Sequence, residues 1–293
     1  MLVTKRVIHV KMKSNNYFNF EEYTGNFIRS ALIEKLRSKC CTNYKLDCYN
    51  CTSQDCVLKN TFIFKENNGK LQLNPIIIDG RVAISGDIIV TKNIEFSVSL
   101  LGKSIEYSSI IEEALQTLEF NNGKERERFR LVELDTQDYT LNTDIKEIKY
   151  SGKIRVVFES YVNVPNHKSK FTKELKETDK LQFNNFVRAC THRVTSLVNT
   201  CSPGELFDYK KFTEKNYNVM MIDSHLEKMC IHRKSSRTKT ESNIRAIRGY
   251  VEYSGDIDEA YDLIKLVSEL HIGKYASLGL GKFTVEMLDG SEK

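Results

Sequence analysis

Three glycines lie close together near the end of the chain, in the segment His271-Ile-Gly-Lys-Tyr-Ala-Ser-Leu-Gly-Leu-Gly-Lys282. They are Gly273, Gly279 and Gly281. Glycine accepts left-handed backbone conformations and allows close approach, so the N–H groups of such a loop could bind a phosphate. The glycines precede a predicted strand rather than open a helix, which excludes a mononucleotide P-loop. The structural alternative is a helix C-cap at Gly273 followed by entry into a strand.

Positive charge is concentrated in the same half of the chain. The net charge is +5, and the whole excess of Lys and Arg over Asp and Glu falls in residues 146–293. Lys274 and Lys282 accompany the glycines. Upstream, one segment holds a single acid, Glu241, and seven basic residues: Lys228, Arg233, Lys234, Arg237, Lys239, Arg245 and Arg248. Cations at this density attract polyanions by neutralising phosphates, although a solvated basic loop is the alternative.

Cysteines form a second group with metal-binding spacing. Cys48 and Cys51 make a Cys-x-x-Cys pair, which Cys40 and Cys56 extend to four thiolates. Four thiolates could close a tetrahedral site for structural zinc or an iron–sulfur cluster, with Cys41 as the alternative to Cys40. No secretory signal appears at the N-terminus, so we expect a metal or free thiols rather than disulfides.

The elements that position these residues follow from hydrophobic periodicity. The first half predicts strand, helix, hairpin, helix and strand, over 7–13, 20–36, 84–101 (turning at Lys92-Asn93), 105–119 and 129–134. The second half repeats the order, with a basic segment before its third element, over 153–164, 181–199, 244–253, 256–270 and 282–287.

Two such units predict an α+β protein with tandem ferredoxin-like (RRM-like) domains. We place the N-terminal domain at 1–145, with a Cys-rich insertion at 40–58. The C-terminal domain spans 146–293 and carries the glycine-rich loop 273–281.

Three collinear segments resemble the RAMP superfamily, and within it the CRISPR-associated endoribonucleases that process repeat RNA. The glycine-rich loop resembles the superfamily's C-terminal signature. Arg233-Lys-Ser-Ser-Arg237 resembles its Arg–Ser–Arg segment, and residues 185–197 resemble the helix that opens its second domain. Some members carry a similar Cys-rich insertion after the first helix. The resemblance covers about 181–287 and implies CRISPR repeat RNA as the ligand, mature crRNA as the product, and other CRISPR effector subunits as partners.

The family resemblance and the basic residues together predict which residues contact RNA. Arginine can hold a phosphate or a guanine with two parallel hydrogen bonds, and serine can anchor a phosphate or a 2′-hydroxyl. The candidates are Arg233, Ser235, Arg237, Arg248, Gly273, Lys274, Gly279, Gly281 and Lys282. Arg245 and Tyr250 would extend the same surface, the tyrosine by stacking on a base.

The reaction that the resemblance implies is metal-independent and uses no cofactor: the ribose 2′-hydroxyl attacks the adjacent phosphate and leaves a cyclic phosphate. It needs a base, an acid and a cation. Many relatives place a histidine near the first helix, but none lies between Tyr17 and Cys56 here, so Tyr23 and Lys39 are candidates. Three histidines are the other catalytic candidates: His192, His232 and His271. Each is alternatively an ordinary surface or capping histidine.

Two other functions remain open at this stage. The chain could be a non-catalytic crRNA-binding subunit of an effector complex, since the same basic loop would serve it. A metal- or redox-responsive DNA-binding regulator would use the cysteines, but no helix-turn-helix pattern supports it. No apolar run is long enough to span a bilayer, so we expect a cytoplasmic protein without a membrane partner, and a homodimer is possible.

Overall fold

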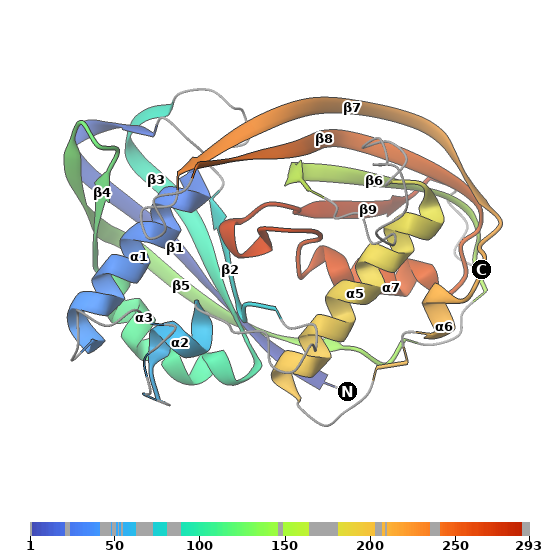
Figure 1. Cartoon of the computed structure of the whole chain (residues 1–293), viewed down its shortest axis with the longest axis horizontal. Coiled ribbons are helices and arrows are strands. Elements are labelled where there is room, and N and C mark those ends of the chain that lie inside the picture. Colours follow the sequence, from blue (N-terminus) through green and yellow to red (C-terminus); the bar gives the residue numbers. More distant parts are fainter. Residues whose placement is uncertain are drawn as a thin grey trace.

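A computed structural model shows the arrangement of the chain (Figure 1). It describes residues 2–20, 24–41, 48, 51, 53, 55–62, 73–80, 89–145, 149–163, 181–202, 207–208, 210–234 and 241–288. At residues 89, 232–234 and 241–242 the backbone alone is described. The described chain forms two β-sheets that lie beside each other, with helices packed on both.

The N-terminal unit is a five-stranded sheet in the order β2-β3-β1-β5-β4, and all neighbouring strands are antiparallel. Its strands are β1 (Leu2–Phe20), β2 (Ile76–Gly80), β3 (Ile89–Leu101), β4 (Thr117–Asn121) and β5 (Arg126–Asn142). Its helices are α1 (Thr24–Cys40), α2 (Val57–Thr61), the 3₁₀ helix η1 (Gly102–Tyr107) and α3 (Ser108–Leu115).

The C-terminal unit is a four-stranded antiparallel sheet in the order β7-β8-β6-β9. Its strands are β6 (Ser151–Val162), β7 (Val219–Lys234), β8 (Glu241–Asp256) and β9 (Phe283–Met287). Its helices are α5 (Phe183–Cys201), α6 (Lys210–Thr213), α7 (Ala260–Ser268) and the 3₁₀ helix η2 (Ala276–Leu278). In Figure 1 the long β7–β8 pair arches over α5 and α7.

These strand orders confirm the predicted tandem ferredoxin-like architecture. The first and third strands of each β-α-β-β-α-β unit lie next to each other inside its sheet, as in a ferredoxin-like domain. These strands are β1 and β3 in the N-terminal unit, and β6 and β8 in the C-terminal unit. The N-terminal sheet has one strand more than this order needs. The additional strand, β4, pairs only with β5 and forms the edge of the sheet.

Several predicted elements were wrong in detail. The expected turn at Lys92-Asn93 does not exist, because β3 continues through it and pairs with β1 from Ile89 to Leu101. The strand that accompanies β3 is β2, which the sequence analysis missed. The helix expected over 105–119 is η1 followed by α3, and β4 begins at Thr117. The basic segment before β8 contains another missed strand, β7.

Some apolar residues of the N-terminal sheet pack into the core of the C-terminal unit. Val3, Leu101 and Leu141 belong to the same buried cluster as residues of α5 and α7. A separate cluster fills the space between the N-terminal sheet and its helices, and includes Ile8 of β1 and Leu32 of α1. Because apolar surface is buried where the units meet, the hydrophobic effect favours a defined arrangement of the two sheets.

Within the described part of the chain, no helix has the length and hydropathy needed to span a bilayer.

Candidate nucleic-acid interface

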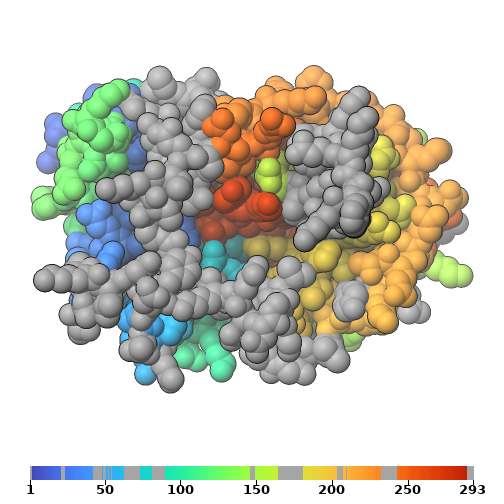
Figure 2. All heavy atoms as spheres, viewed as in Figure 1, coloured from blue at the N-terminus to red at the C-terminus, as the bar shows by residue number. Residues whose placement is uncertain are grey.

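The glycine-rich loop lies at the junction between the two units. Its 3₁₀ helix η2 packs against β2 of the N-terminal sheet. Across this contact Asn74 Nδ2 lies 3.4 Å from Ser277 Oγ. Figure 2 shows red C-terminal residues reaching the surface between blue N-terminal residues and the yellow residues of α5. We call this region, formed by 269–282 and the residues that contact it, the junction.

All three glycines of the loop have left-handed backbone conformations. The φ angles of Gly273, Gly279 and Gly281 are 83°, 87° and 81°. At Gly281 a Cβ atom would lie 1.8 Å from the carbonyl oxygen of Ile272. The Ile272 N–H donates to the Gly281 carbonyl at 2.8 Å. Glycine is therefore required at 281 by the close approach of the loop to itself, and Gly281 is buried.

Several backbone N–H groups of the loop are already used inside the protein. The Gly279 N–H donates to Ala276 O and the Gly281 N–H to Tyr161 O, both at 2.9 Å. The Lys274 N–H donates to Asn163 O at 2.9 Å. In this conformation these groups are not available to a phosphate, so the expected amide cradle does not form at Gly279 and Gly281. Gly273, which is half-buried, lies at the start of the same turn.

Ser160 of β6 joins two points of the loop. Its buried hydroxyl donates to the Gly279 carbonyl at 2.9 Å and accepts from the Lys282 N–H at 2.9 Å. The backbone N–H groups of Glu159 and Ser160 in turn donate to the Lys282 carbonyl. The sequence analysis missed Ser160, because a serine inside an apolar strand carries no signal of a partner more than a hundred residues away.

Lys282 forms ion pairs with carboxylates of both units. Its Nζ lies 3.0 Å from Asp79 Oδ2 in β2 and 3.0 Å from Glu159 Oε2 in β6. Burial acts to lower the pKa of Lys282, but the two carboxylates raise it overall. The lysine stays charged and links the N-terminal sheet to the C-terminal one. Its role as an RNA contact stays a prediction.

Two further cations fix the start of the loop. Lys5 Nζ of β1 donates to the Glu269 carbonyl at 2.9 Å and lies 2.7 Å from its carboxylate. Arg193 of α5 donates to the Leu270 carbonyl through Nε at 3.1 Å and Nη2 at 2.7 Å. The carbonyls at the end of α7, which have no partner within the helix, are therefore satisfied by side chains from both units.

His271 is buried within these charges. Only 6% of its surface is exposed, and its φ angle is 57°. Its Nδ1 has no hydrogen-bond partner among the described residues. Burial lowers the pKa of His271 to about 4, and the nearby positive charges of Arg193 and Lys282 act in the same direction against Asp79. His271 is thus buried and neutral at neutral pH in this structure, and its catalytic role stays a prediction.

The remaining catalytic candidates do not gather at one point of the described structure. His192 is half-buried on α5, and burial lowers its pKa. Lys39 forms an ion pair with Glu113 of α3 at the end of α1. Tyr23 lies outside the described residues, as does the side chain of His232.

The expected RNA contacts are also distributed. Arg248 lies on β8, in register with Glu227 of β7. The side chain of Arg233 is outside the described residues, as are Ser235 and Arg237.

Asn163 links the backbones of two exposed basic residues at the junction. Asn163, at the end of β6, donates from Nδ2 to the Arg245 carbonyl at 2.6 Å and accepts from the Lys274 N–H at 2.9 Å. Arg245 lies on β8 and Lys274 on the glycine-rich loop, and both side chains are exposed. The loop is held below the β7–β8 pair by a small apolar cluster that includes Tyr161, Leu280 and Ile244, among others. Asn163 therefore links the backbones of two exposed basic residues that belong to different elements.

The cysteines do not form a cluster of metal ligands. Within the described part of the chain, which includes Cys40, Cys48, Cys51 and Cys56, no three His, Cys, Asp or Glu side chains are placed to hold a metal ion. Burial raises the pKa of the Cys40 thiol, and the nearby thiol of Cys56 acts in the same direction. Three of the thiols, those of Cys40, Cys48 and Cys56, pack beside the N-terminal core. A structural metal at these residues stays a prediction.

Comparison with known proteins places the chain in a family. Residues 3–159 match the family model AF_1859_N, which is described as an N-terminal domain. The chain belongs to the AF_1859_N family. The matched region includes the whole N-terminal sheet and most of β6. No curated protein matches the sequence of this AF_1859_N chain at a significant level.

Solved structures resemble the AF_1859_N chain over nearly its whole length. A chain of a partial Cas6-RT-Cas1–Cas2 complex covers 97% of it with a TM-score of 0.62 and 11% identity. The match covers only 46% of that chain, and 29% of the corresponding chain in a second Cas6-RT-Cas1–Cas2 complex. Thermus thermophilus Cas6 matches 97% of the present chain and 99% of its own, with a TM-score of 0.56 and 8% identity. The AF_1859_N chain therefore has the fold of Cas6, which agrees with its two ferredoxin-like units.

Proposed function

We propose that this chain binds CRISPR repeat RNA across the junction and cuts it. The observation that carries the proposal is the link between the backbones of Lys274 and Arg245 through Asn163, which joins the glycine-rich loop to β8 at two residues with exposed basic side chains. Lysine and arginine at such positions neutralise successive phosphates, and arginine can also grip one with two hydrogen bonds. The fold shared with Cas6, including a Cas6 product complex with a TM-score of 0.53 at 9% identity, supports RNA as the ligand.

The proposed reaction needs no metal ion. The ribose 2′-oxygen attacks the adjacent phosphorus while a base takes its proton, and a new 2′-oxygen–phosphorus bond forms. The bond from phosphorus to the 5′-oxygen breaks, and this oxygen receives a proton from an acid. The products are a 2′,3′-cyclic phosphate and a 5′-hydroxyl. Cations near the phosphate stabilise the charge that develops in the transition state.

Among the catalytic candidates, His192 is the described residue that fits the base best. It is half-buried, and burial lowers its pKa, so its imidazole is neutral and can accept a proton at neutral pH. We propose His192, His232 and Tyr23 as the residues to test. Each would be changed separately, as His192→Gln, His232→Gln and Tyr23→Phe.

The test is cleavage of the repeat RNA by the full chain in EDTA. We expect one cut that persists in EDTA, leaves a cyclic phosphate, and is abolished by a single 2′-deoxy substitution at the nucleotide before the cut. Lys274→Gln with Arg245→Gln should reduce the slope of log affinity against log salt by about 1.4, or about 0.7 for each lost phosphate contact. The charge-matched control is Lys103→Gln with Lys210→Gln, since both lysines are exposed and away from the junction.

A second candidate function is crRNA binding without cleavage, as part of a CRISPR complex with other proteins. One observation favours it: the burial of His271, which removes one of the histidines expected to act on RNA. Tight binding of repeat RNA by folded protein, without any cut product and unaffected by the three substitutions above, would establish this second function. Absence of both binding and cleavage would exclude both candidates.

A further inference from the structure

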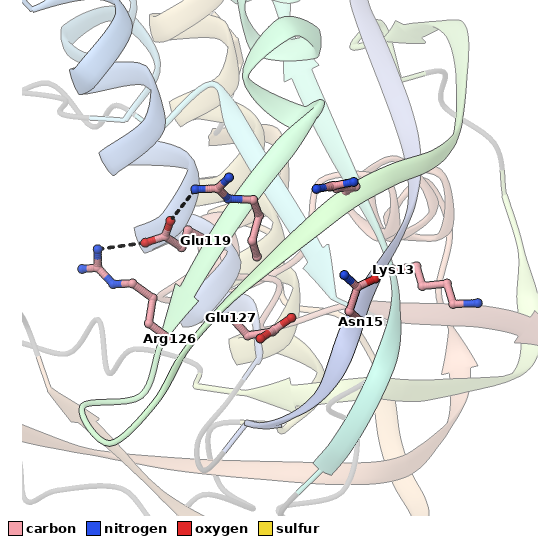
Figure 3. Close-up of a pocket in the computed structure, with 7 residues that line it drawn as sticks. Lys13, Asn15, Glu119, Arg126 and Glu127 are labelled. Atoms are coloured by element: carbon pink, nitrogen blue, oxygen red, sulfur yellow. Dashed lines mark ion pairs between the residues drawn. The ribbon is translucent and has the colours of Figure 1, made fainter.

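A second basic site lies on the N-terminal sheet, at its end away from the C-terminal unit. Residues of β1, β4 and β5 line an open hollow of about 400 Å³ (Figure 3). Its cations, which we call the β5 cluster, are Lys13, Arg126, Arg128 and Arg130, and Asn15 lies beside them. Two carboxylates, Glu119 and Glu127, complete the lining.

The carboxylates do not neutralise the β5 cluster. Glu119 lies 2.8 Å from Arg126 and 3.6 Å from Arg128, as the dashed lines in Figure 3 show. Glu127 accepts a hydrogen bond from Asn16 at 3.2 Å. Within the described residues, Lys13 and Arg130 have no ion-pair partner. The hollow therefore keeps an excess of positive charge.

Lys13 and Arg130 face each other directly across the β1–β5 ladder. Like charges in this position disfavour the strand pairing, because their Cβ atoms are only about 5 Å apart. A bound anion between them would remove the repulsion. Arg128 lies two residues from Arg130 on the same strand and therefore about 7 Å away, comparable with the distance between successive phosphates of an extended nucleic-acid strand.

An exposed aromatic ring lies further along β1, outside the lining of the hollow. It belongs to Tyr17, which comes four residues after Lys13 and is 64% exposed. The Nζ of Lys92, on the neighbouring strand β3, lies 4.8 Å from the centre of the Tyr17 ring. Exposed aromatic rings beside cations are the usual platform on which the bases of a single strand stack. An acidic protein partner would need the cations but not the ring.

The β5 cluster is separate from the junction. β5 is three strand spacings from β2 in the order β2-β3-β1-β5-β4, a distance of about 14 Å, and β2 is the strand that contacts η2. Figure 1 shows β4, with β5 beside it, on the side of the sheet away from the C-terminal unit. A ligand that fills the hollow therefore lies outside the site proposed above.

We propose that the β5 cluster binds the phosphates of a single-stranded RNA segment that extends beyond the part held at the junction, and that Tyr17 stacks on one of its bases. The inference rests on the proposed function for the identity of the RNA, but concerns different residues. The guanidinium groups of Arg128 and Arg130 would each hold a phosphate oxygen pair, and Lys13 would supply the third contact.

The test compares two variants with the same loss of charge. Lys13→Gln/Arg128→Gln/Arg130→Gln removes the two unpaired cations together with Arg128, whose contact with Glu119 is the longer one at 3.6 Å. Arg126 is kept because it pairs with Glu119 at 2.8 Å. The control triple variant replaces three exposed lysines elsewhere, Lys103, Lys149 and Lys210, by glutamine. Affinity for repeat RNA and for polyuridine would be measured over a range of salt concentrations.

We expect the cluster variant to bind both RNAs at least about tenfold more weakly than the control, with a salt slope lower by about 2. Cleavage of saturating repeat RNA should continue at the control rate, because the cluster does not touch the scissile phosphate. Tyr17→Leu should weaken binding about fivefold or more, whereas Tyr17→Phe, which keeps the ring, should bind as the wild type does.

The failures of the two proposals are distinguishable. If the wild-type chain binds and cuts repeat RNA but the cluster variant binds as tightly as the control, the cluster does not hold RNA and the inference is overturned alone. If the wild-type chain binds neither RNA, the proposed function fails together with it. Equal affinities of Tyr17→Leu and Tyr17→Phe would overturn the stacking role of the ring.

Discussion

Lys282 joins Asp79 across the boundary between the two ferredoxin-like units, with 3.0 Å between Nζ and Oδ2. The side chain of Asp79 is only 16% exposed. The same ammonium group also lies 3.0 Å from Glu159. The residue directly before the last strand is therefore a lysine that holds the N-terminal edge strand β2 and the central strand β6 together.

Replacing Lys282 by methionine should destabilise the protein more than replacing Asp79 by asparagine. Lys282→Met leaves two carboxylates without their cation, whereas Asp79→Asn leaves the lysine paired with Glu159. We expect a loss of about 3 kcal/mol for the first change and about half as much for the second. Urea unfolding of both variants and of the double variant measures the two losses and their coupling.

The exposed pair between Lys11 and Glu133 is the control for this measurement, because its atoms are similarly close at 2.8 Å but both side chains are about half exposed. Lys11→Met should leave the unfolding midpoint unchanged. A Lys282→Met protein that is as stable as the wild type but binds RNA more weakly would show that Lys282 is an RNA contact after all.

Gly281 and Gly123 have nearly the same backbone conformation, with φ angles of 81° and 90°, but different surroundings. A Cβ at Gly281 would meet the carbonyl of Ile272 at 1.8 Å, whereas nothing lies within 4 Å of a Cβ at Gly123. Gly123→Ala should cost only the left-handed strain, about 1 kcal/mol. Gly281→Ala must also move the backbone, and we expect about 3 kcal/mol or more. The difference between their thermal unfolding midpoints separates conformational strain from crowding, and equal midpoints would contradict this account of the loop.

Periodic helices were predictable because their apolar spacing alone determines the buried face. Helix α5 was expected over 181–199 and spans Phe183–Cys201. Its predicted apolar positions, such as Phe186, Val194 and Leu197, are all buried. The prediction needed no knowledge of what the helix packs against.

The missed strands lack such a signal. β2 has three consecutive isoleucines at Ile76–Ile78 and no alternation, so its five residues do not distinguish a buried strand from other buried segments. β7 is an edge strand with many exposed side chains, including Lys228 and Cys230, and its sequence favours a basic loop as much as a strand. Pairing with β8 determines its structure.

At the junction, the roles of single side chains were also not predictable from the sequence alone. The sequence identifies Lys282 as a cation beside glycines, which predicts a phosphate contact as readily as an ion pair. Only the fold brings Asp79 to it from the other unit. The hydrogen bonds by which Asn163 and Ser160 hold the loop were not predicted either, because their partners are distant in the sequence.

The burial of His271 predicts a loss of stability in mild acid. Burial lowers its pKa to about 4 from an ordinary value of 6.5, so between these pH values the unfolded chain binds a proton that the folded chain does not. Protonation then favours unfolding, and stability falls as the pH decreases through this window. For this histidine alone we expect a loss of roughly 2 kcal/mol between about pH 7 and pH 5.

His271→Asn tests this relationship, because asparagine tolerates the left-handed conformation at this position but does not titrate. Urea unfolding at both pH values should show that the difference in stability is smaller in His271→Asn than in the wild type by roughly 2 kcal/mol. The exposed His225 is the matched control, and His225→Asn should keep the wild-type difference. The comparison depends only on the change with pH, so any loss of packing in His271→Asn, which is common to both pH values, cancels. An unchanged difference in His271→Asn would mean that the imidazole is accessible to protons in the folded protein, and would restore it as a candidate for acid–base catalysis.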